Sequence, residues 1–479
     1  MLKISETEVL ARFAFDNPWW QPGNGIETRF LNLPRRAYFP SFCALVEDTT
    51  LNRAVVLMGP RRVGKTVMVF HAIARLLAQQ VPGNQIFYLS LETPIYTGIA
   101  LEKLLHSFQE KFGHRRDASL TIFFDEVQYL RDWEVHLKSL VDSYPAYRFV
   151  VTGTAAAALK LKGQESGAGR FTDFILPPLS FFEYISFIGK TEALIECKPV
   201  TTDQEGSLEY LAKDIHALNH EFCNYLQYGG YPEAVMLEAV RRDADRYIKS
   251  DIIDKVLLRD LPSLYGISDI QELNRLFTTL AYNTGGEISL EGLAQTAVVA
   301  KNTIKRYLDY LEAEFLIRRV SRIDKNAKHF QRETHFKVYL TNPSMRAALF
   351  GEIDETGTAM GHLVETAIFS QWQHQSMAQL HYARWKTGEV DIVYLNAHNQ
   401  RPDWIVEVKW SDRVATDWVE LNNCVEFVGN HKLKSGVVFV TTKTVTAQCT
   451  YRGLQFSFVP SSVYAYTIGA SALTSRNNS

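Results

Sequence analysis

Eight residues, 59–66, read Gly-Pro-Arg-Arg-Val-Gly-Lys-Thr and constrain this chain more than any other segment. They meet every fixed position of the phosphate-binding pattern G-x-x-x-x-G-K-[ST]. Glycine at the two fixed positions lets the backbone approach phosphate oxygens and direct its N–H groups toward them. We expect Lys65 to reach the β- and γ-phosphates and the Thr66 hydroxyl to hold Mg²⁺. The predicted nucleotide-binding loop is Gly59, Pro60, Arg61, Arg62, Val63, Gly64, Lys65 and Thr66.

The flanks of this loop have the composition that a phosphate site requires. Residues 54–58 are a short apolar run of strand type, and residues 67–80 have a helical pattern. The loop is therefore expected between a strand and a helix N-terminus, where the helix dipole favours an anion. A chance match in a glycine-containing turn is the alternative, and both flanks argue against it.

A second apolar strand, 120–124, ends in Asp125 and Glu126. A strand that is apolar throughout belongs in a parallel sheet covered on both faces. We expect Asp125 to complete the Mg²⁺ site and Glu126 to polarise the attacking water. The next such strand ends near Thr152 and Thr154, and either hydroxyl is a candidate to contact the γ-phosphate. The predicted cofactors are therefore ATP and Mg²⁺.

Beyond residue 150 the order of short motifs resembles a known family. Thr152-Gly153 is followed by Gly169-Arg170, by Pro-Leu-Ser-Phe-Phe-Glu at 178–183 and by Gly-Gly-Tyr-Pro-Glu at 229–233. This order is similar to that of the AAA-type P-loop ATPases of bacteria and archaea with a nuclease-like C-terminal domain of unknown function. The resemblance implies that Arg170 is an arginine finger for a neighbouring subunit, within a ring or other oligomer, a hexamer by analogy. A surface arginine is the alternative.

Composition is compatible with a globular intracellular protein. At about 150 residues per domain, 479 residues suggest roughly three domains. No apolar run is long enough for a membrane helix, and the N-terminus lacks the apolar core of a signal peptide. The five cysteines are scattered and without a C-x-x-C pair, which favours buried thiols in a reducing cytoplasm. The net charge of −2 means that any DNA contact must use a local patch.

Residues 268–342 supply such a patch. Their pattern predicts helices at 271–282, 289–295 and 301–311, then strands at 316–320 and 337–340, which is the order of a winged helix-turn-helix. Between residues 296 and 337, ten Lys and Arg stand against five acids. This excess fits phosphate contact, and packing without DNA is the alternative. The predicted DNA contacts are Lys301, Lys305, Arg306, Arg318 and Arg319.

The C-terminal segment carries a second chemical signal. Asp391 lies in a predicted strand at 388–395, and Glu407 and Lys409 lie in another at 404–410. A hairpin would bring them together, and the two carboxylates then favour Mg²⁺, with Lys409 acting on the water or phosphate. This order resembles the PD-(D/E)XK nuclease superfamily, which implies a further helix acid at Glu365. Val390 stands where that superfamily usually has proline.

We therefore predict an α/β protein. The expected parts are a lead-in packed on the ATPase (1–50), a P-loop AAA-type ATPase domain (51–190), a helical lid (191–267), a winged helix-turn-helix (268–342) and a PD-(D/E)XK nuclease-like α/β domain (343–479). The sequence is compatible with three functions. The first is an ATP-driven nuclease acting on duplex or branched DNA, and the second is an ATP-gated DNA-binding remodeller that does not cleave. The third is a regulatory or defence switch for which DNA is incidental.

Overall fold

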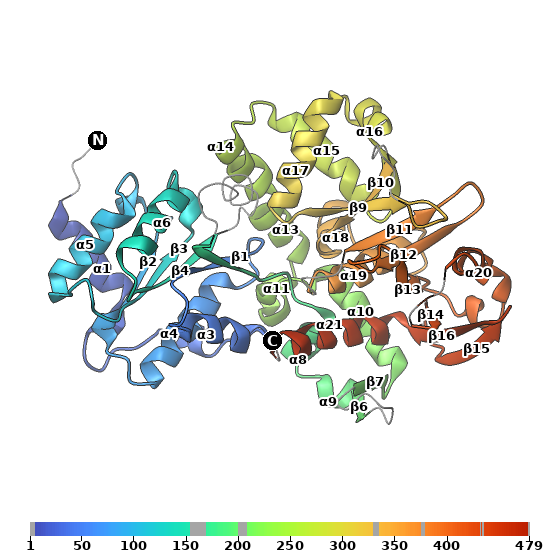
Figure 1. The fold of residues 1–479 in the computed structure, drawn as a ribbon, viewed down its shortest axis with the longest axis horizontal. Helices are drawn as coiled ribbons and strands as arrows, with labels where there is room; N and C mark the ends of the chain where they lie inside the picture. Colours follow the sequence, from blue (N-terminus) through green and yellow to red (C-terminus); the bar gives the residue numbers. More distant parts are fainter. Residues whose placement is uncertain are drawn as a thin grey trace. The chain divides into compact units, whose positions relative to one another are not determined.

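The computed structural model describes residues 5–153, 169–199, 208–328, 335–374, 379–431, 433 and 435–477, and it falls into two units (Figure 1). Residues 1–176 and 313–315 form the first unit, and residues 177–312 and 316–479 form the second. The predicted lead-in at 1–50 thus belongs to the same unit as the phosphate-binding loop. The predicted boundaries after 190, 267 and 342 all fall inside the second unit.

The first unit is built on a parallel five-stranded sheet, as the apolar strands predicted. Its strand order is β2-β3-β4-β1-β5. The strands are β1 (Ala54–Met58), β2 (Ile86–Ser90), β3 (Thr121–Asp125), β4 (Arg148–Gly153) and β5 (Phe171–Ile175). The carboxyl ends of parallel strands meet at one edge, so the ends of β1, β3 and β4 lie together there.

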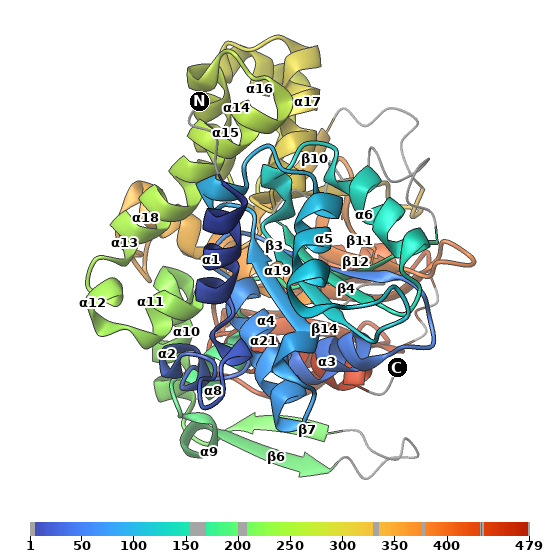
Figure 2. The same ribbon diagram turned by 90° about the vertical axis from the view of Figure 1, so that its left-hand side faces the viewer.

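Helices cover both faces of this sheet (Figure 2). They are α1 (Glu6–Asp16), α2 (Thr28–Leu31), α3 (Phe39–Glu47), α4 (Lys65–Ala78), α5 (Leu101–Phe112) and α6 (Trp133–Ser143). One core joins α1, α5 and α6 to alternate strand residues such as Val56 and Phe124. Successive side chains of a strand point to opposite faces, so Val55 and Leu57, also buried, serve the other face. This two-sided burial explains why the strands are apolar throughout.

The lead-in covers the edge strand β2. The Asn17 side chain donates to the Tyr88 carbonyl (2.8 Å) and accepts from the Tyr88 N–H (2.6 Å), so it pairs with β2 as a neighbouring strand would. The indoles of Trp19 and Trp20 both donate to the Ile86 carbonyl. These bonds satisfy an edge that would otherwise be open to strand pairing. The lead-in, which the sequence predicts to pack on the ATPase domain, makes these hydrogen bonds to β2.

The second unit contains a mixed nine-stranded sheet of order β15-β16-β14-β13-β12-β11-β9-β10-β8. Its strands are β8 (Glu287–Ser289), β9 (Ile317–Ile323), β10 (His335–Leu340), β11 (Leu380–Arg384), β12 (Glu389–Leu395), β13 (Pro402–Glu407), β14 (Val437–Thr442), β15 (Ala447–Tyr451) and β16 (Leu454–Pro460). Strands β9 and β11 pair in parallel at Arg322–Tyr382. The sheet is therefore continuous across residue 342, where the sequence suggested a domain boundary.

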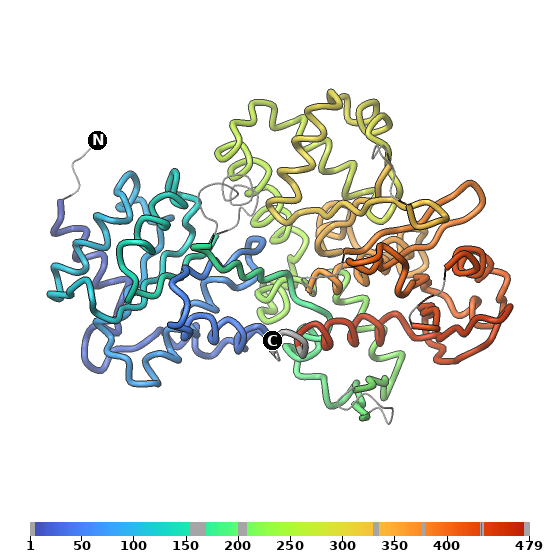
Figure 3. The backbone as a smooth tube through the Cα atoms, viewed as in Figure 1, coloured from blue at the N-terminus to red at the C-terminus, as the bar shows by residue number. Residues whose placement is uncertain are grey.

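The helices of the second unit pack on both faces of this sheet and at its β8 end, and the backbone can be followed in Figure 3. They are α8 (Phe181–Phe187), α9 (Thr191–Leu194), α10 (Ile215–Tyr228), α11 (Pro232–Met236), α12 (Glu238–Arg241), α13 (Ala244–Ile248), α14 (Leu261–Tyr265), α15 (Ile270–Tyr282), α16 (Leu290–Ala297), α17 (Lys301–Ala313), α18 (Ser344–Phe350), α19 (Met360–Trp372), α20 (Asn422–Val428) and α21 (Ser461–Asn477). Helices α15, α16 and α17 precede the pairing of β9 with β10, in the predicted order.

Some local predictions were wrong. The segment predicted to be helical after 190 contains an antiparallel strand pair, β6 (Ile195–Pro199) with β7 (Leu208–Ala212). Cys197 is exposed, while Cys43 and Cys424 are buried as expected.

Two motifs of the family resemblance have structural explanations. Ser180 and Glu183 form a capping box at the start of α8, each side chain bonded to the backbone of the other. Gly230 lies against Asn342, and a Cβ at Gly230 would come within 1.9 Å of the Asn342 amide nitrogen. Both motifs therefore stabilise the second unit.

Candidate functional site

The phosphate-binding loop follows β1 and leads into α4, as predicted. Gly64 has φ +95°, in the left-handed region that favours glycine. Gly59 approaches the backbone so closely that a Cβ there would lie 2.1 Å from the Leu176 carbonyl oxygen. The guanidinium of Arg36, in the lead-in, donates to the Val63 carbonyl at 2.7 Å. The two glycines and Arg36 together fix the path of the loop.

Lys65 is buried within this loop. Its ammonium donates to the carbonyls of Gly59 (3.0 Å) and Pro60 (2.9 Å). Burial lowers the pKa of Lys65, and the charges of Glu126 and Asp125 partly oppose this shift. The ammonium is thus held at the loop by weak carbonyl partners, which phosphate oxygens outcompete because a charged acceptor binds an ammonium more strongly.

Asp125 ends β3 and is surrounded by hydroxyl groups. Its Oδ2 accepts from Thr66 (2.9 Å) and from Tyr88 (3.0 Å), and its Oδ1 accepts from Thr152. Burial raises the pKa of Asp125, and the neighbouring charge of Glu126 adds to this effect. A hydroxyl and a carboxylate in contact are hard oxygen ligands, so these residues fit Mg²⁺. The Tyr88 bond was missed, because a tyrosine inside an apolar strand looks like core.

Glu126 follows Asp125 with φ +58°, an uncommon conformation for a non-glycine residue. Its N–H donates to the Thr152 hydroxyl at 3.0 Å, and its carboxylate accepts from the Gln128 amide. Thr152 therefore fixes both acids at the carboxyl edge of the sheet. Thr154, the other candidate on that strand, lies outside the described residues.

Arg170 lies beside the amino-terminal ends of the strands, on the side of the sheet opposite the phosphate-binding loop. Its carbonyl accepts from the N–H of Ala54, the first residue of β1, whereas the phosphate-binding loop follows the last residue of β1. The guanidinium forms an ion pair with Asp142. Arg170 is therefore separated from the loop of its own chain by the length of the strand.

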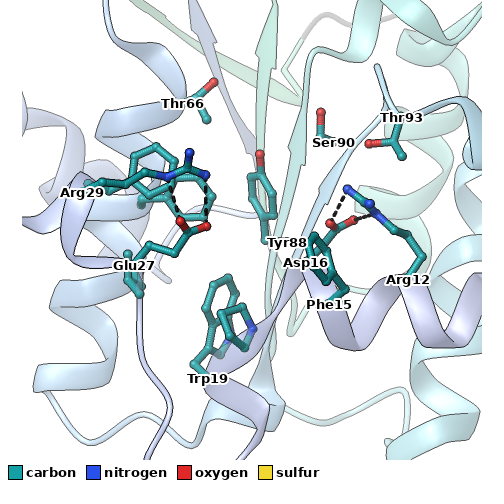
Figure 4. Close-up of a pocket in the computed structure, with 14 residues that line it drawn as sticks. Arg12, Phe15, Asp16, Trp19, Glu27, Arg29, Thr66, Tyr88, Ser90 and Thr93 are labelled. Atoms are coloured by element: carbon teal, nitrogen blue, oxygen red, sulfur yellow. Dashed lines mark hydrogen bonds and ion pairs between the residues drawn. The ribbon is translucent and has the colours of Figure 1, made fainter.

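A cavity of about 290 Å³ adjoins Thr66 between the lead-in and the sheet. Figure 4 shows the ion pair of Arg12 with Asp16 on one side, that of Arg29 with Glu27 on the other, and Tyr88 between them. Residues of the lead-in thus line a cavity that Thr66, a predicted Mg²⁺ ligand, also lines.

In the second unit the predicted nuclease-like residues do come together. Strands β12 and β13 form the expected hairpin, and Asp391 Oδ2 accepts the Val408 N–H at 2.9 Å. The Lys409 ammonium lies 2.7 Å from Glu407 Oε1 and 4.0 Å from Asp391 Oδ2. Strand β13 ends at Glu407, so Lys409 lies just beyond it. Glu365, from α19, is buried beside them.

A second lysine, which sequence reasoning missed, occupies the same group. The ammonium of Lys337, on β10, lies 2.8 Å from Glu365, 2.7 Å from Glu389 and 3.7 Å from Asp391. The carboxylate–lysine cluster, as we call it, comprises Lys337, Glu365, Glu389, Asp391, Glu407 and Lys409. In the sequence, Lys337 is one basic residue in an alternating strand and carries no motif.

The charged groups of this cluster alter one another's pKa values. Burial raises the pKa of Glu365 to about 7 and, together with the Asp391 charge, that of Glu407 to about 7. Burial opposes ionisation of Asp391 too, but the ammoniums of Lys409 and Lys337 outweigh it and lower the pKa of that carboxyl. Among the described residues, no three His, Cys, Asp or Glu side chains are arranged to hold a metal ion. The predicted Mg²⁺ ligands Asp391 and Glu407 are instead paired with lysines.

The predicted DNA contacts differ in availability. Lys305, Arg306 and Arg318 are exposed and make no ion pair with the described part of the chain. Lys301 makes one exposed pair with Glu291 at 3.3 Å. The Arg319 guanidinium is engaged by two carboxylates, those of Asp309 (2.6 Å) and Glu312 (2.5 Å). Arg319 is therefore a poor candidate for DNA contact.

Comparison with known families places two segments. Residues 51–185 match the family described as "AAA domain", and residues 219–356 match a family described as "Domain of unknown function (DUF8612)". The first segment is thus an AAA-type P-loop ATPase domain. Asp391, Glu407 and Lys409 lie outside both matches.

Relatives span most of the chain. A protein of Haemophilus influenzae, described as uncharacterized, is 23% identical over 385 residues, which cover 79% of this chain and 87% of that protein. One of Methanocaldococcus jannaschii, also described as uncharacterized, is 22% identical over 361 residues, with 73% and 74% covered. Their descriptions assign no activity.

Two solved structures of DNA-bound proteins are similar in part. The replication initiator DnaA, bound to AMPPCP and single-stranded DNA, gives a TM-score of 0.29 at 12% identity and covers 62% of this chain and 93% of that one. The Aeropyrum pernix Orc1 protein in complex with DNA gives 0.33 at 11%, with 69% and 95% covered. Scores this low carry no argument about the present chain. Within the described residues, no helix is long and apolar enough to cross a membrane.

Proposed function

We propose that this chain, whose residues 51–185 are an AAA-type P-loop ATPase domain, hydrolyses ATP and uses the nucleotide state to control DNA binding by its second unit. The observation that carries ATP hydrolysis is the contact of Thr66 with Asp125, with Glu126 next in the chain. The phosphate-binding loop, the proposed metal ligands and the proposed general base then lie together at the carboxyl ends of the strands.

The residues of this edge have separate roles. Lys65 exchanges its two carbonyl partners for the β- and γ-phosphate oxygens. Thr66 and Asp125 would hold Mg²⁺, which neutralises charge on the phosphates when bound. Glu126 accepts the proton of the attacking water, and Thr152 holds its backbone in place.

Arg170 points to self-association. Since it lies at the edge of the sheet away from its own loop, it can complete only the site of a neighbouring copy. We therefore propose action in trans, in a ring or other oligomer. A hexamer is the form suggested by the family resemblance.

DNA is the proposed ligand of residues 268–342. Three helices followed by paired strands support a winged helix-turn-helix, with α17 as the helix that meets DNA. Lys305 and Arg306 on α17 and Arg318 on β9 are exposed cations without carboxylate partners in the described residues. They are suited to phosphate contact, which supplies affinity without sequence information.

Metal-dependent cleavage at Asp391, Glu407 and Lys409 is the competing function for the PD-(D/E)XK-like part. Because lysines already pair with the carboxylates of this part, we propose that it binds DNA without cleaving it. The test is the ATPase rate with and without single-stranded, duplex and four-way-junction DNA, scored in parallel for cleavage with Mg²⁺ or Mn²⁺. Stimulation without cleavage is expected. A rate indifferent to all three DNAs would overturn the proposed coupling.

A further inference from the structure

The ammonium of Lys337 is the centre of the carboxylate–lysine cluster. It lies within 2.8 Å of a Glu365 oxygen and 2.7 Å of a Glu389 oxygen, and Asp391 is 3.7 Å away. An ammonium has three N–H donors and no acceptor, so two close carboxylates and a third nearby match its capacity. The Lys337 side chain is only 3% exposed, so water does not compete for these donors.

The surroundings fix the ammonium in this place. The Tyr339 hydroxyl donates to the same Glu365 oxygen at 2.6 Å, and the Tyr382 ring lies 5.3 Å from the Lys337 nitrogen, within cation–π range. These groups come from β10, α19 and β11, and with Glu389 and Asp391 of β12 they hold the cation in position.

A divalent ion would compete with Lys337 for the same oxygens. Mg²⁺ requires carboxylate oxygens at about 2.0–2.1 Å in near-octahedral geometry. Asp391, one of the two predicted Mg²⁺ ligands, lies 3.7 Å from the fixed ammonium, and the helix acid Glu365 lies 2.8 Å from it. A metal next to it would place two cations in a buried site, where charge repulsion is weakly screened.

Two further carboxylate oxygens of the cluster are also engaged. Glu407 Oε1 pairs with Lys409 at 2.7 Å, and Asp391 Oδ2 accepts the Val408 N–H. Buried charges persist when they are paired and hydrogen-bonded, and here the protein itself supplies the counter-ions.

We propose that Lys337 is the built-in cation of the carboxylate–lysine cluster, and that the wild-type cluster takes up no divalent metal ion. The ammonium joins β10 to α19 and β12. This inference rests on the proposed function in one respect, the absence of DNA cleavage by the second unit. It does not depend on the proposals that the chain hydrolyses ATP and binds DNA.

The test measures Mn²⁺ binding by full-length protein, without nucleotide or DNA, from the loss of the free-Mn²⁺ electron paramagnetic resonance signal. An Asp125→Asn background removes the carboxylate of the predicted Mg²⁺ site in the first unit. In that background the Lys337-containing protein should bind no Mn²⁺. Lys337→Met, which keeps length and removes charge, should gain one bound Mn²⁺, and adding Asp391→Asn should abolish the gain.

Two further variants control for folding and for general charge loss. Lys337→Arg retains a cation and should stay free of Mn²⁺. Lys325→Met removes a lysine that pairs with Glu426 outside the cluster, at 2.6 Å, and should also gain nothing. If circular dichroism shows that Lys337→Met does not fold, the test is the Mn²⁺ binding of the Lys337-containing protein compared with that of its Asp391→Asn variant.

Mn²⁺ bound by the Lys337-containing protein and lost in Asp391→Asn overturns the inference. If that protein also cleaves DNA, the non-cleaving function falls with it. If it binds Mn²⁺ but leaves DNA intact, only the built-in cation is refuted.

Discussion

The Thr66 hydroxyl donates to Oδ2 of Asp125 over 2.9 Å, joining the helix that follows the phosphate-binding loop to the end of β3. These residues are 59 positions apart in the chain, and each was predicted separately as an Mg²⁺ ligand. Their contact is what makes the two motifs one site.

Glu126→Gln should bind ATP with nearly unchanged affinity and hydrolyse it about 10²–10⁴-fold more slowly, the usual worth of a general base. Nucleotide binding by fluorescent-ATP titration and phosphate release should be measured on the same sample. Lys65→Ala is the contrasting variant and should lose binding as well, because the phosphates lose their main cation. Wild-type turnover by Glu126→Gln would rule out its role.

Tyr88→Phe should weaken the Mg²⁺ site without touching the loop. The lost bond is to a carboxylate, and such bonds contribute about 1.5–3 kcal/mol, so the Mg²⁺ concentration for half-maximal ATPase should rise roughly 10- to 100-fold. Tyr96→Phe is the matched control: its hydroxyl donates to Asp16 at 2.9 Å, away from the metal ligands. Equal shifts in both variants would mean a general loss of stability.

Arg170→Ala should reduce turnover by roughly 10³-fold while sparing ATP affinity, if it acts as an arginine finger. Mixing Arg170→Ala with Lys65→Ala should restore part of the activity, since each supplies what the other lacks. Arg131→Ala removes an exposed arginine paired with Asp132 and serves as control. Full ATPase activity in a protein that stays monomeric by light scattering would refute action in trans.

Lys305→Ala with Arg306→Ala should weaken binding to all DNA sequences alike. Each lost phosphate contact should reduce the slope of log affinity against log salt by about 0.9 on duplex DNA. Fluorescence anisotropy at several salt concentrations gives this slope. Lys325→Ala is the control, and an unchanged slope in the double variant would move the DNA surface away from α17.

Arg319→Ala should behave differently from those substitutions. Its guanidinium pairs with Asp309 and Glu312, so its loss removes the cation from both carboxylates and should lower the melting temperature more than it alters the salt slope. A reduced slope with an unchanged melting temperature would restore Arg319 as a DNA contact.

Local pattern was a good guide wherever one segment carries its own chemistry. About ten residues were enough to predict each of three elements: the loop at 59–66, the strand ending in Asp125 and the hairpin around Asp391. Glycine placement, strand hydrophobicity and turn polarity are local properties of the sequence. Element ends and long-range sheet order were less predictable. The missed strand pair β6–β7 is exposed along most of its length, so it lacks the apolar signal of a buried strand.

Residue type and spacing were enough to predict the phosphate-binding loop, the acids Asp125 and Glu126 at the end of an apolar strand, and the α/β character of the chain. Which distant groups lie together depends on the fold, because sheet order and helix packing bring them into contact. The fold placed Tyr88 on Asp125, joined β9 to β11 across the expected boundary, and inserted Lys337 among Glu365 and Asp391. A lysine in a strand has no fixed partner in sequence, and its role is set by the carboxylates that sheet order brings to it.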